Sequence, residues 1–245
     1  MLFLQHVIRS LNHGGRCGIV LDEGVLFRTN EDAFVKTKRK LTDDCDLWCI
    51  VSLPGRVFYA AGAGVKTNLL FFNKGKATEK IWYYDLSDVK VGKKTPLTRK
   101  HFDDFFARMP TREESEQSWT IDLAARKAKA AEDARPFHEL AREKSQAAEL
   151  VKERISQLKR IKPRNENAIA EATATYKTLA AESRDAAGKA EAIQNAAYDL
   201  KAVNPNRKTI VDSRTPTELM NLIEVKGREV AAALARLREL STTIR

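Results

Sequence analysis

The residues best suited to chemistry cluster in a predicted loop between two apolar strand-like segments. Phe58 follows the turn Leu-Pro-Gly-Arg-Val at what would be the carboxyl end of a buried strand, the edge at which α/β sheets bind ligands. A lone aromatic there either stacks on a flat ligand or packs beneath its own loop. Arg56, Lys66 and Thr67 flank it and are candidates for contacting phosphate. The alternative for each of these three residues is a solvated place in the loop.

Acidic, sulfur and imidazole side chains give weaker indications. Asp22 and Glu23 follow another predicted strand, where helix capping or turn formation is favoured over ligand binding. The three cysteines include no Cys-x-x-Cys pair, and the histidines show no metal-ligand spacing. We therefore expect neither a disulfide framework nor a metal site.

Basic residues gather in two further stretches of the first half. The first contains Lys36, Lys38, Arg39 and Lys40, and the second runs from residue 90 to 100. Both could face DNA, but the acidic residues around the first stretch favour a solvated helix face, and we read the second in the same way.

Composition places the chain among globular proteins. It has 245 residues, of which 43% are hydrophobic and 31% charged, and its formal net charge is +10. This charge suits an acidic partner such as nucleic acid without proving one. No apolar run approaches the roughly 20 residues of a membrane span, and the apolar start carries His6 and Arg9, so we expect a cytoplasmic protein with no membrane partner.

The first half predicts an α/β sheet. Short apolar runs alternate with helical patterns, which is typical of strands covered on both faces. Strands are expected at 16–21, 47–53, 67–72 and 81–86, and helices around 4–11 and 31–42.

The second half predicts long helices, and the change in composition places a domain boundary between 1–116 and 117–245. Helices are expected at 121–161 and 165–202, each with a heptad seam rich in alanine, and a third begins at the capping box Thr215-Pro216-Thr217-Glu218. Alanine seams bury little area. The helices are therefore either arms braced by a partner or a self-contained three-helix bundle.

Three segments carry a resemblance to a known family. They are FLQHVIRSLNHGGRCGIVLDEGVLF at 3–27, LWCIVSLPGRVFYAAGAGVKTNLLFFNKG at 47–75 and YDLKAVNPNRK at 198–208. In this order and spacing they resemble the C-terminal portion of the modification (M) subunit of type I restriction-modification systems, an adenine-N6 DNA methyltransferase.

The resemblance implies a partial, Rossmann-like methyltransferase sheet over 1–116, followed by an all-α region of long helices. In the intact enzyme, S-adenosylmethionine would be the methyl donor. Phe58 would stack on the extruded target base, with Arg56, Lys66 and Thr67 near its phosphates. The family's Asn-Pro-Pro motif is missing, and the one Gly-x-Gly, at Gly62 and Gly64, precedes a strand instead of following one. We therefore expect a C-terminal fragment that has no catalytic or cofactor-binding residue of its own and is inactive alone.

The resemblance also implies partners. DNA and the specificity subunit of a type I system are expected, with the restriction subunit or self-association through the helices as further candidates. The rival interpretation is a non-enzymatic helical interaction protein or DNA-binding protein whose α/β half is a remnant.

Overall fold

The computed structural model describes residues 1–59, 62, 64–92, 94–201, 203–206 and 214–243. The chain divides into two compact units, Met1–Arg207 and Lys208–Arg245. Among the described residues, no helix is both long and apolar enough to cross a membrane.

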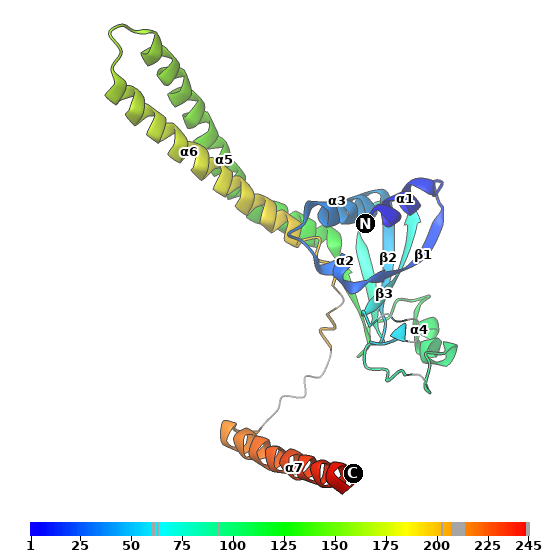
Figure 1. Ribbon diagram of the computed structural model, residues 1–245. Helices are drawn as coiled ribbons and strands as arrows, with labels where there is room; N and C mark the ends of the chain where they lie inside the picture. Colours follow the sequence, from blue (N-terminus) through cyan, green and yellow to red (C-terminus); the bar gives the residue numbers. More distant parts are fainter. Residues whose placement is uncertain (60–61, 63, 93, 202, 207–213, 244–245) are drawn as a thin grey trace. The chain divides into compact units, whose positions relative to one another are not determined.

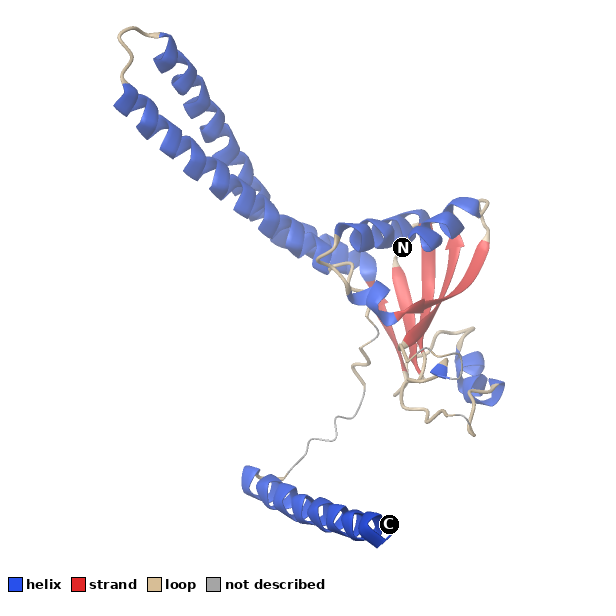
Figure 2. Ribbon diagram, in the orientation of Figure 1, coloured by secondary structure: helices blue, strands red, loops and turns tan. Residues whose placement is uncertain are grey.

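A mixed five-stranded sheet forms the centre of the first unit (Figure 2). Its strands are β1 (Arg16–Asp22), β2 (Cys45–Ser52), β3 (Thr67–Lys74), β4 (Lys80–Asp85) and β5 (Ser118–Asp122), in the order β1-β3-β2-β4-β5. Only β2 and β4 run parallel to each other; the other neighbours are antiparallel. The four predicted strands are confirmed.

The fifth strand was not predicted, because its residues SWTID show no long apolar run. β5 is held instead by its neighbour: the ring of Trp119 stacks on that of Tyr83, with centroids 5.2 Å apart. The sheet thus continues past residue 116, and the division of the chain into 1–116 and 117–245 stays a prediction drawn from composition.

Three helices cover one face of the sheet: α1 (Leu2–Ser10), α2 (Glu23–Phe27) and α3 (Asp32–Asp44) (Figure 1). α1 and α3 match the predicted helices, and α2 is an additional short one. Leu4 and Ile8 of α1 pack with Leu47 of β2 and Phe72 of β3 in one core cluster. Burying such apolar side chains on the sheet stabilises this face.

The opposite face is covered only in part, although the sequence predicted cover on both faces. The 3-10 helix η2 (Arg99–Phe102) and α4 (Asp103–Arg108) bring Phe105 against Trp82 and Tyr84 of β4. On β1, however, the side chain of Val20 points outward and is 44% exposed.

A long hairpin leaves the sheet at β5 (Figure 1). It consists of α5 (Leu123–Arg160) and α6 (Glu166–Ala196). Asp122 ends β5 and also caps α5, since its carboxylate accepts a hydrogen bond from the Ala125 amide. The strand therefore continues into the helix without a connecting loop.

The end of α6 differs from the prediction. The helix was expected to reach residue 202, but it stops at Ala196 and the chain turns back onto the sheet. The Leu200 side chain is fully buried there, and its amide donates to the carbonyl oxygen of Leu26 at 3.1 Å. Packing on the sheet thus outweighs the continuing helical pattern.

The second unit contains α7 (Pro216–Thr243). Its capping box is present as predicted: the Thr215 amide donates to Glu218 Oε2 at 2.6 Å, and the Glu218 amide donates to Thr215 Oγ1 at 3.3 Å.

Candidate functional site

The loop after β2 presents two adjacent aromatic side chains. Phe58 is 36% exposed and Tyr59 is 67% exposed, and neither belongs to a core cluster. The base of the loop is closed by a hydrogen bond from the Leu53 amide to the Thr67 carbonyl at 3.1 Å. The loop therefore holds Phe58 at the carboxyl end of β2, where a flat ligand can reach its ring.

Arg56 lies in a tight turn of this loop. Its φ of 67° is left-handed, a conformation that costs a non-glycine residue about 1–2 kcal/mol. The Tyr59 amide donates to the Arg56 carbonyl at 3.1 Å, and the Arg56 guanidinium lies 5.9 Å from the centre of the Tyr59 ring. The side chain is exposed and has no carboxylate partner among the described residues. Arg56 is thus available to an anion.

Lys66 and Thr67 are placed differently. The Lys66 ammonium pairs with Glu23 at 3.1 Å, which already balances its charge. Thr67 is only 8% exposed, and its hydroxyl has no hydrogen-bond partner among the described residues. The structure brings both residues beside the Phe58 loop but does not expose them as it exposes Arg56. Their contact with phosphate stays a prediction.

Asp22 takes the capping role that its sequence context favoured. Its Oδ1 accepts a hydrogen bond from the Val25 amide at 3.3 Å, at the start of α2. The Glu23 amide donates to the Lys66 carbonyl at 2.9 Å, which ties the end of β1 to the end of the Phe58 loop. These two acidic residues are therefore structural in this chain.

A row of buried polar side chains crosses the same edge of the sheet and was not foreseen from sequence. Asn68 pairs in register with Ser52, and Ser52 with Asp85, so the three side chains share one face. All three are buried. The Ser52 hydroxyl and both polar atoms of the Asn68 amide lack a hydrogen-bond partner among the described residues. The sequence does contain one signal for this row, which is the amide of Asn68 within the apolar run Thr-Asn-Leu-Leu-Phe-Phe.

The first basic stretch is not a single solvated face, as had been favoured. Lys38 is 1% exposed, and Arg39 donates from Nη2 to Asn195 Oδ1 at 2.8 Å at the root of the hairpin. Lys36 and Lys40 form exposed pairs with Asp32 and Asp44. This stretch therefore offers little free charge to DNA.

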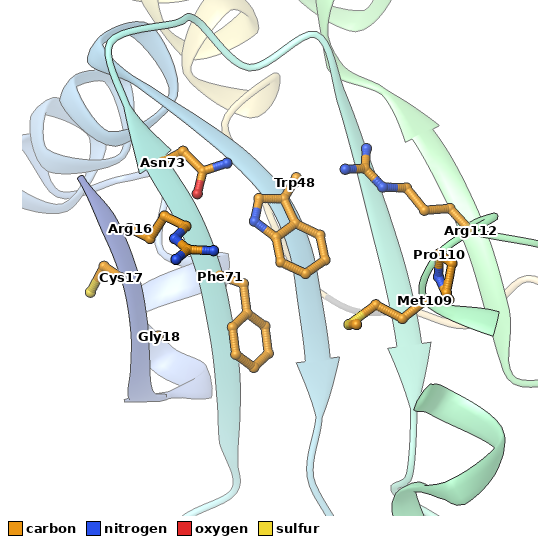
Figure 3. A pocket seen from close by; sticks show the side chains of 9 residues that line it. All are labelled: Arg16, Cys17, Gly18, Trp48, Phe71, Asn73, Met109, Pro110 and Arg112. Atoms are coloured by element: carbon orange, nitrogen blue, oxygen red, sulfur yellow. The ribbon is translucent and has the colours of Figure 1, made fainter. Parts of the chain in front are cut away.

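A cavity of about 530 Å³ lies on the partly covered face, near the start of β1 (Figure 3). Its floor is formed by Trp48 and Phe71, whose ring centroids are 5.6 Å apart, and the Arg112 guanidinium lies 5.3 Å from the Trp48 ring. A Cβ atom at Gly18 would lie 3.1 Å from the Phe71 ring, so glycine lets that ring lie against β1. This cavity is separate from the loop that carries Phe58.

The described residues contain no group of three or more side chains able to hold a metal ion. Cys17, Cys45 and Cys49 are free thiols. Burial raises the pKa of Cys45 to about 11, so this thiol is not a nucleophile at neutral pH.

Comparison with known proteins identifies the sheet and its loop. The model of the N-6 DNA Methylase family matches residues 1–134, which is more than half of the chain. The protein belongs to the N-6 DNA Methylase family. The match includes all five strands, the Phe58 loop and the start of α5.

Curated relatives in this family are subunits of type I restriction enzymes. The chain is 39% identical over 116 residues to the StySJI methylase subunit of Salmonella typhimurium, covering 43% of this chain and 21% of that protein. It is 38% identical over 137 residues to the EcoEI methylase subunit of Escherichia coli, covering 50% and 26%. This N-6 DNA Methylase chain thus spans about a fifth to a quarter of the length of these relatives.

One solved structure matches the whole chain. It comes from work on complex assembly and conformational transition of the type I restriction-modification system, is 25% identical and has a TM-score of 0.50. The match covers 100% of this chain and 39% of that chain. The likeness therefore extends beyond the family match into the long helices.

Proposed function

We propose that this chain forms the target-base side of a type I modification methyltransferase that transfers a methyl group from S-adenosylmethionine to adenine N6 in DNA. The observation that carries the proposal is that the family match includes the loop holding Phe58 exposed at the carboxyl end of β2. A base extruded from the helix loses its stacking neighbours, and an exposed aromatic ring replaces them. Arg56 would neutralise an adjacent phosphate, and Lys66 and Thr67 would lie behind it.

The residues of this chain do not fit the methyl donor. To bind S-adenosylmethionine, a methyltransferase needs a glycine-rich turn after a strand. In this chain β1 runs directly into α2 at Asp22. Gly62 and Gly64 lie in the loop before β3 instead. We infer that another part of the enzyme holds S-adenosylmethionine and completes a Rossmann-like sheet. The partly uncovered face with Trp48 and Phe71 is a surface that such a part could cover.

The long helices would provide the contact with the specificity subunit. In α5 and α6, positions of the two predicted heptad seams such as Ala148, Ala186 and Ala190 are buried. In α7, the apolar side chains of Ile223 and Leu237 are 69% and 62% exposed. Small residues let helices approach closely, and exposed apolar stripes on a helix suit a helical partner. With DNA as its substrate, the protein would be located in the cytoplasm.

The test is reconstitution. The chain is mixed with the remaining part of a type I modification subunit, its specificity subunit and target DNA, and transfer of tritiated methyl groups to DNA is measured. We expect methylation only in the complete mixture, and a loss of roughly 10- to 100-fold for Phe58→Ala, with partial recovery for Phe58→Trp. Phe27→Ala, which removes an exposed aromatic far along the chain from the loop, is the control.

Two results would contradict the proposal. One is full methylation with Phe58→Ala in a mixture that is active with the unchanged chain. The other is tight binding of S-adenosylmethionine to the isolated chain in calorimetry, because its own residues would then form the donor site. Stable binding of double-stranded target DNA that ignores the specificity subunit would favour the rival, non-enzymatic interpretation.

A further inference from the structure

A groove next to the Phe58 loop extends the proposed site beyond the extruded base. Its volume is about 460 Å³. Arg56, Val57 and Tyr59 line one side, and Val91, Pro96 and Leu97 line the other. The groove thus joins the loop after β2 to the segment that follows β4.

The walls of the groove are fixed by the core. Val57 and Leu97 pack against the cluster that contains Trp82 and Phe105. The turn at the far wall is closed by two backbone hydrogen bonds, from the Gly92 amide to the Thr95 carbonyl at 3.0 Å and from the Thr95 amide to the Gly92 carbonyl at 3.1 Å. The concave shape is therefore built into the fold.

Basic residues lie in and beside the groove. Arg56 lines it, Lys90 and Lys94 adjoin the far turn in the sequence, and all three side chains are exposed. In the part of the chain that the structure describes, none of the three forms an ion pair. These features together suit a base and its phosphate. The floor is apolar, the Tyr59 ring is 67% exposed, and the basic side chains beside them have no ion pair among the described residues.

We propose that this groove binds a nucleotide flanking the extruded base on the same DNA strand. Tyr59 stacks on the flanking base, while Lys94, Lys90 and Arg56 neutralise the phosphates on either side. The inference rests on the proposed function for the identity of the strand. Phe58 and Tyr59 are adjacent, so one loop would hold two successive bases on two rings.

The experiment measures binding of the full chain to two short fluorescein-labelled single-stranded DNAs, an oligodeoxyadenylate and the same backbone carrying abasic sites. Tyr59→Ala should weaken binding of the oligodeoxyadenylate by roughly 5- to 100-fold and leave the abasic strand unchanged, because only a base can stack. Tyr59→Phe should retain the affinity. Lys94→Gln should weaken both strands equally and lower the salt dependence of binding.

The controls separate this groove from general charge and from the methyltransferase proposal. Lys129→Gln changes an exposed lysine of α5 and should leave both affinities unchanged. A thymidine oligonucleotide in which 5-iodouracil replaces thymine provides a cross-linking test. After irradiation of its complex with the chain, mass spectrometry should locate the cross-link at Tyr59. Equal losses on both strands for Tyr59→Ala, no binding of either strand, or a cross-link that avoids Tyr59 would each overturn the inference. Absent methylation alone would overturn only the proposed function.

Discussion

Lys38 places an ammonium group inside the first unit. Its Nζ donates hydrogen bonds to the carbonyl oxygens of Leu26 at 2.8 Å and Arg28 at 2.7 Å, at the end of α2. Burial lowers the pKa of Lys38 from 10.5 to about 8, and the negative charge of Asp199 opposes part of this change. The folded protein therefore releases this proton more readily than the unfolded chain does.

The pH dependence of stability follows from that difference. The penalty for holding charged Lys38 is fully present below about pH 8 and disappears between about pH 8 and 10.5. Over this range we expect the free energy of unfolding of the natural protein to rise relative to Lys38→Met, by up to about 3 kcal/mol. Urea denaturation of both proteins at several pH values measures it. A constant gap between the two proteins across the range would show that Lys38 does not titrate in this way.

Asn68 gives a second prediction at the residue scale. Both polar atoms of its amide are buried without a partner among the described residues, and such groups cost about 1–3 kcal/mol. We expect Asn68→Leu, which is similar in size and apolar, to raise the free energy of unfolding by about 1 kcal/mol in urea denaturation. Asn73→Leu, on the same strand but only half-buried, should change it little. Destabilisation by Asn68→Leu would mean that the amide is satisfied in solution.

One aromatic ring lies between α3 and the root of the hairpin. Tyr198 lies beneath two cations, with the Arg39 guanidinium 4.9 Å and the Lys127 ammonium 5.0 Å from the ring centre. Arg39 is also held by Asn195, and Lys127 pairs with Asp43 at 2.6 Å. The contact therefore joins α3, α5 and the segment after α6.

Replacing this ring should loosen the hairpin. We expect Tyr198→Leu to lower the free energy of unfolding by about 1–2 kcal/mol, because it keeps apolar contact but removes two cation–π interactions. Tyr176→Leu is the matched control, since its half-buried ring in α6 has no cation over it among the described residues. Chemical denaturation followed by circular dichroism compares the two. Equal losses would assign the effect to packing alone.

Elements set by local pattern were predictable, whereas those set by distant contacts were not. The apolar runs that became β2 and β3, and the long helical pattern of α5 that continues past Pro136, gave strands and helix close to their observed bounds. The Phe58 loop was found because its signal is also local, an aromatic after a Leu-Pro turn. The burial of Lys38 and the early end of α6 depend on contacts across the fold, so their own neighbours in sequence did not indicate them.

At the scale of the whole molecule, the second unit exposes a row of apolar side chains along α7. Met220, Ile223, Val230 and Leu237 of α7 are each more than half exposed. A single helix in water is marginal without a partner. The exposed stripe is therefore the feature of this unit that a partner would cover.

Ile223→Asp tests that contact. We expect it to weaken co-purification with a type I specificity subunit by about tenfold or more, because it places a charge in an apolar interface. Asn221→Asp adds the same charge two residues before Ile223, on a different face of α7, and is the matched control. The denaturation midpoint of Met1–Arg207 should stay unchanged in both variants. Undiminished co-purification of Ile223→Asp would exclude α7 as the binding element.

The return of the chain to the sheet after the hairpin also bears on how the protein is synthesised. Leu200 is fully buried in the same cluster as Leu4 and Ile8, and the Tyr83 hydroxyl donates to its carbonyl oxygen at 3.3 Å. A side chain needed to complete that cluster thus leaves the ribosome only after both long helices have been made. Until then the apolar cluster on the nascent sheet lacks the Leu200 side chain. The first unit therefore reaches its final stability only after the hairpin has been synthesised.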